Sequence, residues 1–122
     1  MNIVLLEDDT DAREAMAALL SLDAHQVDQA YDADSFSQAT RDLSGEVVIF
    51  DLQLGHDGNG LALVMDYQAR RQAAGLGLAK LIALSGSADA DRLIAGIRPQ
   101  FPVHHRFVKP ADHGQILAAL GG

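Results

Sequence analysis

Apolar residues follow two alternating patterns along this chain, and the alternation predicts the fold. Short unbroken apolar runs, of which Val47–Phe50 is the clearest, are typical of strands that are buried on both faces of a parallel sheet. Between these runs, apolar residues recur every three or four positions, as they do on one face of a helix. The expected strands are 3–6, 26–31, 47–51, 81–84 and 103–108, and the expected helices begin at Asp11, Asp34, Leu61, Asp89 and Asp112.

Five strands that alternate with five helices predict an α/β fold, namely a doubly wound five-stranded parallel sheet with helices on both faces. Of the two common strand orders in such folds, we expect the flavodoxin-like (βα)5 order, 2-1-3-4-5. The polar composition of 26–31 indicates a strand at the edge of the sheet. The chain shows no repeat or linker, and its 122 residues suit one domain, which we expect to span 1–122.

Acidic residues mark the predicted starts of the first two helices. Asp11, followed by Glu14, matches a capping box, and Asp34 is the expected cap of the second helix. On the faces turned to the sheet we expect Ala12, Met16, Leu19 and Leu20 in the first helix and Phe36, Ala39 and Leu43 in the second.

Polar side chains follow four of the predicted strands at the point where each strand ends. They are Glu7 and Asp8, Asp51, Ser85, and Lys109. The carboxyl ends of parallel strands meet at one edge of a sheet, where ligands bind in open α/β folds, so we expect these side chains to lie together. Each has a simpler explanation by itself, as a cap (Asp8 or Asp9 for the first helix) or as a solvated charge. Their joint occurrence at four strand ends favours a site.

The side chains at these strand ends indicate phosphoryl chemistry. Carboxylates that lie close together repel one another unless a cation sits among them. A site that offers only oxygen ligands suits Mg²⁺, which binds one or two carboxylates together with waters and phosphate oxygens. A carboxylate beside the metal can attack phosphorus and form an aspartyl phosphate. An ammonium group and a hydroxyl, as Lys109 and Ser85 provide, would stabilise the transferred phosphoryl oxygens.

Composition excludes several other classes of function. The net charge of −8 and the presence of only two lysines argue against nucleic-acid binding. The absence of cysteine excludes a disulfide scaffold, a thiolate zinc site and a cysteine nucleophile. The N-terminus does not match a signal peptide, and no apolar run approaches the roughly 20 residues that span a bilayer. We therefore expect a cytoplasmic protein that contacts no membrane.

With these residues in view, the sequence resembles the receiver domains of two-component response regulators. The resemblance covers essentially the whole chain, and its motifs occur in the family's order and spacing. They are Leu6-Glu7-Asp8-Asp9, Phe50-Asp51-Leu52-Gln53-Leu54, Leu84-Ser85-Gly86 and Val108-Lys109-Pro110. Any one of them is a weak signal, whereas the four together are specific.

The resemblance implies a role for each acidic residue. Asp51 would be the phosphoacceptor, and Asp8 and Asp51 would bind Mg²⁺ directly. Gln53 would bind the metal through its backbone carbonyl, and Glu7 would act on it through water. The Gln53 side chain would also influence the lifetime of the phosphorylated state.

The resemblance also implies the residues that contact the phosphoryl group. Ser85, Gly86 and Lys109 would bind it, with Ser85 as the switch hydroxyl. Pro110 would follow a cis peptide bond, which is common in the family and otherwise rare. Ser87, like Gln53, would tune the rate of dephosphorylation.

The partners that the resemblance implies are proteins. A sensor histidine kinase or a histidine phosphotransfer protein would supply the phosphoryl group. A downstream protein would bind the face formed by helix 4, strand 5 and helix 5, and the phosphate could also be relayed onward. Whether the chain is a complete single-domain regulator or part of a longer protein is left open by the sequence, although Met1 favours an N-terminal receiver or a complete protein.

Three positions depart from the family's pattern. The family usually has an aromatic switch residue three positions before the lysine, and here that position holds Arg106. Gly55 stands where proline is common, and Gly60 falls one residue later than usual. Separately, His104 and His105 precede Arg106, and on an edge strand we expect them to face solvent rather than to bind a metal.

Two other classes of function compete with the receiver. A Mg²⁺-dependent phosphohydrolase could use the same aspartyl nucleophile, but haloacid dehalogenase-like enzymes have a second aspartate two residues later, where this chain has Gln53. A flavodoxin-like electron carrier would need a phosphate loop after the first strand. The acids Glu7, Asp8 and Asp9 would repel the flavin phosphate there.

Overall fold

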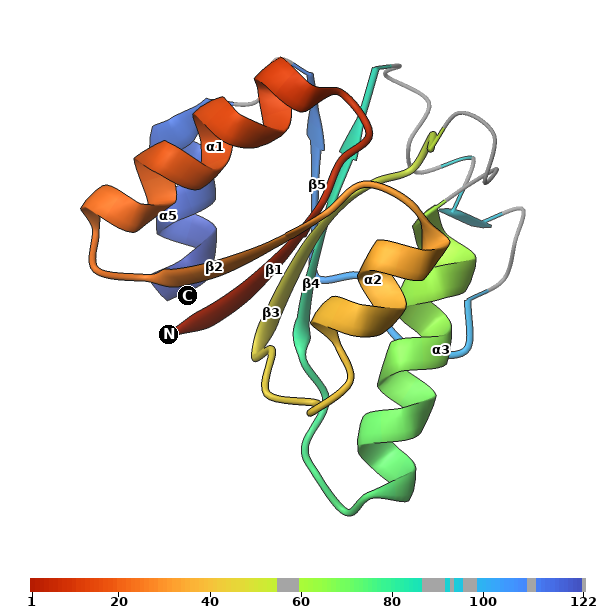
Figure 1. Ribbon diagram of the computed structural model, residues 1–122. Helices are drawn as coiled ribbons and strands as arrows, with labels where there is room; N and C mark the ends of the chain where they lie inside the picture. Colours follow the sequence, from red (N-terminus) through yellow and green to blue (C-terminus); the bar gives the residue numbers. More distant parts are fainter. Residues whose placement is uncertain (55–59, 87–91, 93, 96–98, 110–111, 122) are drawn as a thin grey trace.

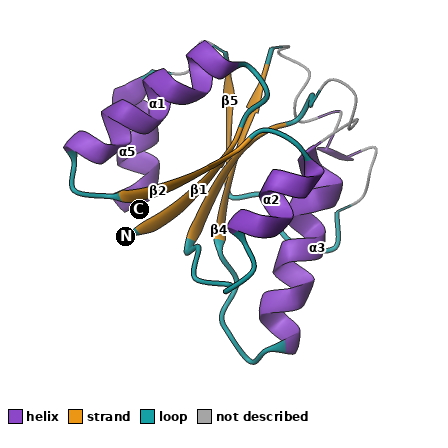
Figure 2. Ribbon diagram, viewed as in Figure 1, coloured by secondary structure: helices purple, strands orange, loops and turns teal. Residues whose placement is uncertain are grey.

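The computed structural model describes residues 1–54, 60–86, 92, 94–95, 99–109 and 112–121. Within them, five parallel strands form one sheet in the order β2-β1-β3-β4-β5, which confirms the predicted fold class and topology. The strands are β1 (Asn2–Leu6), β2 (Gln26–Ala30), β3 (Val47–Asp51), β4 (Lys80–Ser85) and β5 (His105–Val108). The helices are α1 (Thr10–Leu22), α2 (Ala33–Ala39), α3 (Gly60–Ala73) and α5 (His113–Gly121). Helices α1 and α5 cover one face of the sheet, and α2 and α3 cover the other (Figures 1 and 2).

The apolar runs form the three central strands because both faces of these strands are covered by helices. Alternate residues of β1 point to opposite faces, so that Val4 packs with the α2 and α3 side and Leu5 packs with the α1 and α5 side. All five residues of β3 are buried. Strand β2 is mostly exposed and lies at the edge, as its polar sequence predicted.

Helix α1 begins earlier than the sequence pattern suggested. Its N-cap is Asp9, whose side chain accepts a hydrogen bond from the Ala12 backbone N–H at 3.0 Å. The expected start at Asp11 was therefore wrong, because the acid two residues earlier already satisfies the first free N–H group. Its apolar face is also rotated: the buried residues are Ala17 and Leu20.

Of the other residues expected on the buried face of α1, Met16 is half-buried, Ala12 is exposed, and Leu19 is 41% exposed. The cap at Asp9 does not change the spacing of the apolar residues along the helix, so it does not explain the rotation. The apolar face of α1 is wider than the part that packs on the sheet, and the remainder is exposed to solvent.

Helix α2 shows the same displacement of its cap. Asp32 rather than Asp34 is the N-cap, and it forms a reciprocal capping box with Ser35. The helix ends at Ala39 with Thr40 as its C-cap. Leu43, expected on the buried face of this helix, lies beyond it in a turn at a positive φ of 60°.

The last strand and last helix agree with the sequence in part. Strand β5 begins at His105, two residues later than expected. The residue before it, His104, contacts β4 partly through its side chain, since the Leu81 N–H donates to Nδ1 of His104 at 3.0 Å. The cap of α5 is Asp112 as predicted, since its carboxylate accepts from the Gly114 N–H at 2.6 Å.

The expected fourth helix, 89–98, lies largely outside the described residues. In the part of the chain that the structure describes, no helix is both long and apolar enough to cross a membrane.

Close packing joins the end of β3 to the start of α3. A Cβ atom placed on Gly60, the first residue of α3, would lie 2.3 Å from the Asp51 carbonyl oxygen. Glycine is therefore required at this point, because no other side chain fits against the backbone. At the opposite edge of the sheet, Lys80 donates to the carbonyl oxygens of Ala119 and Leu120 and so caps the end of α5.

Candidate functional site

Strand register brings the predicted site residues together at the carboxyl edge of the sheet. Leu6 pairs with Phe50, so the residues that follow them, Glu7 and Asp51, are neighbours. Asp51 in turn pairs with Leu84, the residue before Ser85. Ser85 pairs with Val108, the residue before Lys109, and the Lys109 N–H donates to the Ser85 carbonyl oxygen at 2.7 Å. Four strand ends thus meet at one edge of the sheet, where the sequence analysis expected them.

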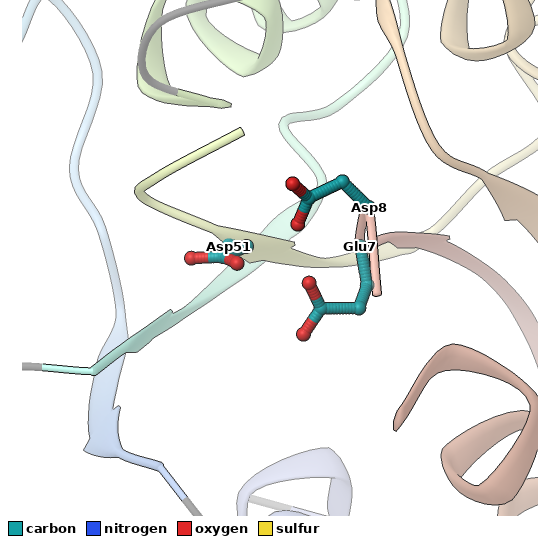
Figure 3. A group of neighbouring side chains, drawn as sticks. All are labelled: Glu7, Asp8 and Asp51. Atoms are coloured by element: carbon teal, nitrogen blue, oxygen red, sulfur yellow. The ribbon is translucent and has the colours of Figure 1, made fainter. Parts of the chain in front are cut away.

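Three carboxylates form the acidic part of the site. Glu7, Asp8 and Asp51 each offer a carboxylate oxygen that lies within 4.8 Å of the others. Glu7 and Asp51 are buried, whereas Asp8 is exposed. Figure 3 shows the side chains of Glu7 and Asp8 both turned toward Asp51. The three acids therefore share a small space that opens to solvent on the Asp8 side.

The ammonium group of Lys109 balances part of this charge. Its Nζ atom lies 2.7 Å from Oδ2 of Asp51 and also forms an ion pair with Glu7. The other oxygen of Asp51, Oδ1, accepts a hydrogen bond from the Gln53 N–H at 2.9 Å. Both oxygens of Asp51 are consequently held in place by the chain itself.

One lysine does not offset the burial of the acids. Desolvation by burial raises the pKa of Glu7 to about 7, and the neighbouring Asp51 adds to this rise, although the hydrogen bond from Lys109 opposes it. Burial alone would lower the pKa of Lys109, but its bonds to Asp51 and Glu7 outweigh burial and raise it. Near neutral pH, Glu7 therefore exchanges a proton readily while Lys109 stays charged.

The remaining predicted residues surround this centre. Ser85 is fully buried at the end of β4. Gly86 is exposed beside it, and a Cβ placed on Gly86 would lie 3.8 Å from Oε1 of Gln53. Gln53 is exposed. These positions leave Gln53 accessible to solvent and keep Ser85 within the packed end of the sheet.

A comparison with models of known protein families gives the decisive observation. The model of the response regulator receiver domain matches residues 3–121. The chain is a receiver domain of the response regulator family. A search of the curated proteins finds no match.

Several solved structures share the fold of this receiver. One is the N-terminal domain of an uncharacterized protein from Wolinella succinogenes, with 26% identity and a TM-score of 0.76, covering 99% of this chain and 91% of that one. The non-phosphorylated HemR receiver domain from Leptospira biflexa has 23% identity and a TM-score of 0.78, covering 98% and 90%. A response regulator from Burkholderia pseudomallei, with a phosphorylated aspartic acid, calcium ion and citrate, has 24% identity and a TM-score of 0.80, covering 98% and 65%.

The acidic group of this receiver has the donor set of a hard divalent cation. Its ligand atoms are carboxylate oxygens, and the described residues place no imidazole with them. Such oxygens suit Mg²⁺ or Ca²⁺ rather than a softer metal. Burial, with a smaller contribution from Asp51, raises the pKa of Glu7 although Lys109 is bonded to it. The residues present therefore fit a divalent metal.

Some predictions fall outside the described residues, and others were incomplete. Ser87, Pro110 and Gly55 belong to the part of the chain that the structure does not describe. Arg106 is exposed. His104 is exposed, but it also accepts the hydrogen bond from Leu81, and burial lowers its pKa.

His105, the second histidine of this strand, is not fully solvent-facing. It is half-buried and stacks on Phe107, with ring centres 6.2 Å apart. The expectation that it faces solvent was thus wrong, because residues 105 and 107 lie on the face of β5 that is turned toward α5.

Sequence reasoning missed one residue next to the acids. Arg13, in the second turn of α1, donates from Nη1 to the Glu7 carbonyl oxygen at 2.9 Å. A helix carries charged residues at many exposed positions, so an arginine there is a weak signal. Its place five residues after Asp8, on the helix that the acidic loop enters, is the feature that could have singled it out.

Proposed function

We propose that this receiver accepts a phosphoryl group on Asp51 from a histidine kinase or a histidine phosphotransfer protein, with Mg²⁺ bound. The observation that carries this proposal is the position of Asp51, which is buried beside two other acids with Lys109 Nζ 2.7 Å from one of its oxygens. A carboxylate in such surroundings can accept an anionic phosphoryl group when a metal and the ammonium of Lys109 neutralise the combined charge. We take residues 1–122 as one domain that would act in the cytoplasm.

In the proposed transfer, a carboxylate oxygen of Asp51 forms a bond to phosphorus as the bond from phosphorus to the donor's imidazole nitrogen breaks. The imidazole leaves with the electron pair of that bond and is neutral once it has lost the phosphoryl group. Bound Mg²⁺ would supply charge neutralisation for the phosphoryl oxygens.

The chain's own residues would position and stabilise the phosphoryl group. Asp8 and Asp51, with the Gln53 backbone carbonyl, would hold the metal, and Glu7 would act through a water molecule. Lys109 would exchange its bond to Asp51 for one to a phosphoryl oxygen, and Ser85 and Gly86 would donate to the others.

The lifetime of the phosphorylated state would depend on the mouth of the site. Gln53 is exposed there, and we propose that its side chain, together with Ser87, limits how water reaches the acyl phosphate. The Gln53 amide carries no acidic proton that could assist hydrolysis. This favours a receiver over the alternative of a phosphohydrolase, in which an aspartate at this position would act as acid and base.

The output of the receiver would be a protein contact or onward phosphotransfer. On the face formed by helix 4, β5 and α5, we propose that the exposed side chains of β5 meet the partner. Arg106 is exposed and Val108 is 49% exposed, so this strand offers both a charge and an apolar surface.

Intact-mass measurement tests the proposal directly. The protein is incubated with Mg²⁺ and a small phosphodonor such as acetyl phosphate, and we expect the mass to rise by one phosphoryl group. The Asp51→Asn variant should show no such adduct. An unchanged wild-type mass, or an equal adduct on Asp51→Asn, would contradict the assignment of Asp51.

Calorimetric titration tests the metal site separately. The Asp8→Asn variant should bind Mg²⁺ at least about tenfold more weakly, because it loses a direct carboxylate ligand, and should not be phosphorylated. Without metal, its fold should be as stable as that of wild type or more so, since a repulsive charge is removed. Unchanged Mg²⁺ affinity would show that the metal binds elsewhere.

A further inference from the structure

The loop that carries the acids is fixed on both sides by its neighbours. On one side, the Glu7 N–H donates to the Ala30 carbonyl oxygen of β2 at 3.0 Å. On the other, the Asp9 side chain caps α1. Asp8 lies between these two anchors and is exposed, so the direction of its carboxylate depends on the peptide group that joins it to Glu7.

Arg13 holds the carbonyl oxygen of that peptide group. Its Nη1 donates to the Glu7 oxygen at 2.9 Å, and its Nε donates to Oε1 of Gln29 at 3.2 Å. The guanidinium also lies over the ring of Tyr31, 5.3 Å from the ring centre. A planar guanidinium can make both bonds and the stacking contact at once, which the single ammonium of a lysine cannot.

We propose that Arg13 is a positioning residue of the metal site in this receiver, an inference that rests on the proposed function. By fixing the peptide between Glu7 and Asp8, Arg13 sets the plane from which both carboxylates project toward Asp51. Gln29 and Tyr31 hold the guanidinium in turn, so that the edge strand β2 takes part in shaping the site.

The charge of Arg13 and its geometry have opposite effects on metal binding. A positive charge near a cation site weakens binding, so on charge alone Arg13→Ala should bind Mg²⁺ more tightly than wild type. Loss of the fixed peptide should instead weaken binding, because Asp8 and Glu7 must be ordered when the metal arrives. The direction of the change therefore decides between the two effects.

Titration calorimetry with Mg²⁺ on three single variants and one double variant gives the test. We expect Arg13→Ala and Arg13→Lys to bind Mg²⁺ about tenfold more weakly than wild type, a loss typical of partners that orient metal ligands. Arg13→Lys keeps the charge, so its loss measures geometry. Gln29→Ala moves no charge and should lose affinity by a smaller factor. The double variant Arg13→Ala/Gln29→Ala should match Arg13→Ala, since Gln29 acts through Arg13.

Arg70 of α3 provides a matched control. Its guanidinium lies 5.5 Å from the centre of the Tyr67 ring and donates from Nε to Asp66 at 3.1 Å, on the other face of the sheet. Arg70→Ala should leave the Mg²⁺ affinity within about twofold of wild type, because its charge is distant and screened. Melting curves in a chelator show how far each variant destabilises the fold. If Arg13 had a purely structural role, its substitution would lower the melting temperature without changing the affinity for Mg²⁺.

Phosphorylation by acetyl phosphate supplies a second readout. For Arg13→Lys, the Mg²⁺ concentration that gives half the maximal rate should rise, while the maximal rate stays within about threefold of wild type, because a group that only orients metal ligands affects binding more than chemistry. Unchanged or tighter Mg²⁺ binding in Arg13→Lys and Gln29→Ala would overturn the role of Arg13 while leaving Asp51 as the phosphoacceptor. A wild-type protein that neither binds Mg²⁺ nor gains a phosphoryl group would overturn the proposed function, and this inference with it.

Discussion

At the scale of single residues, Glu7 shows how burial changes the proton affinity of a carboxyl group in the site. Its carboxyl group is buried among acids, and its pKa is raised from 4.5 to about 7. The folded domain therefore keeps a proton that the unfolded chain loses. The stability that this proton contributes is fully present below about pH 4.5 and is lost as the pH rises toward about 7.

The variant Glu7→Gln should remove this dependence, because a neutral amide replaces the protonated acid. In a chelator, we expect the variant to be more stable than wild type above about pH 7, by at most about 3 kcal/mol. Urea unfolding across this pH range measures the difference. Glu14→Gln, which removes an exposed acid from α1, is the control. An equal pH dependence in wild type and Glu7→Gln would show that another group binds the proton.

Residue positions in the site could be predicted more fully than residue contacts. The ends of apolar runs identified Asp51 and Lys109, because strand ends of a parallel sheet share one edge. The bond of Lys109 to both Glu7 and Asp51 could not be predicted, since it depends on the directions of long side chains. The same limit applies to Arg13, whose partner is a backbone oxygen.

At the scale of elements, the caps were the least predictable feature. Each of these two helices has two aspartates near its start, Asp9 and Asp11 for α1 and Asp32 and Asp34 for α2, and both members of a pair offer the same capping chemistry. The structure uses Asp9 and Asp32, the first of each pair of candidates, because the chain leaves the preceding strand in a direction that brings these carboxylates over the first free N–H groups. Sequence patterns do not contain this direction.

Alanine substitutions test the cap of α2. Asp32→Ala should lower the midpoint of thermal unfolding, because it removes the acceptor for the Ser35 N–H at 2.8 Å and one half of the capping box. Asp34→Ala, two residues further on, should lower it clearly less. The bond to Ser35 also lowers the pKa of Asp32, so the contribution of the cap should persist to acidic pH. Equal effects of the two substitutions would contradict the cap assignment.

The contact between α3 and β3 links helix packing to the site. Gly60→Ala places a Cβ against the Asp51 carbonyl oxygen, so either α3 or the end of β3 must shift. We expect a loss of about 1–3 kcal/mol in the free energy of unfolding, together with slower phosphorylation. Gly77→Ala is the matched control, since a Cβ at Gly77 meets nothing within 4 Å. Urea unfolding and the intact-mass assay measure these two effects. Normal phosphorylation of Gly60→Ala would show that the packing of α3 against β3 does not affect the site.

At the scale of the whole molecule, alternating apolar patterns were sufficient to predict the parallel sheet and its layers, and they reduced the strand order to a choice between two common ones. Buried strands and amphipathic helices in alternation leave few arrangements that cover both faces of a sheet. The apolar pattern could not predict which part of each helix stays exposed, because that exposure depends on the spacing between neighbouring helices. Leu19, which was expected to be buried and is exposed, is an example.

Phosphorylation should change this receiver mainly on one side. The Ser85 hydroxyl and Lys109 would move toward the phosphoryl group and shift the segment after β4 and helix 4. Arg106 is exposed, and burying it without a partner would cost several kcal/mol, so we expect it to stay exposed. NMR shifts of a beryllofluoride-activated sample should therefore be large after β4 and small along β5. Shifts of equal size throughout β5, or an inward turn of Arg106, would contradict this.

The two lysines also determine how the protein can be labelled. Lys80 is bonded to the end of α5 and Lys109 to the acids, so both amines should react more slowly in the folded state than an amine without such bonds. Because the chain has no cysteine, thiols introduced at exposed positions would be the sole sites for thiol-directed dyes. A pair of fluorophores could thus be attached without modifying either lysine.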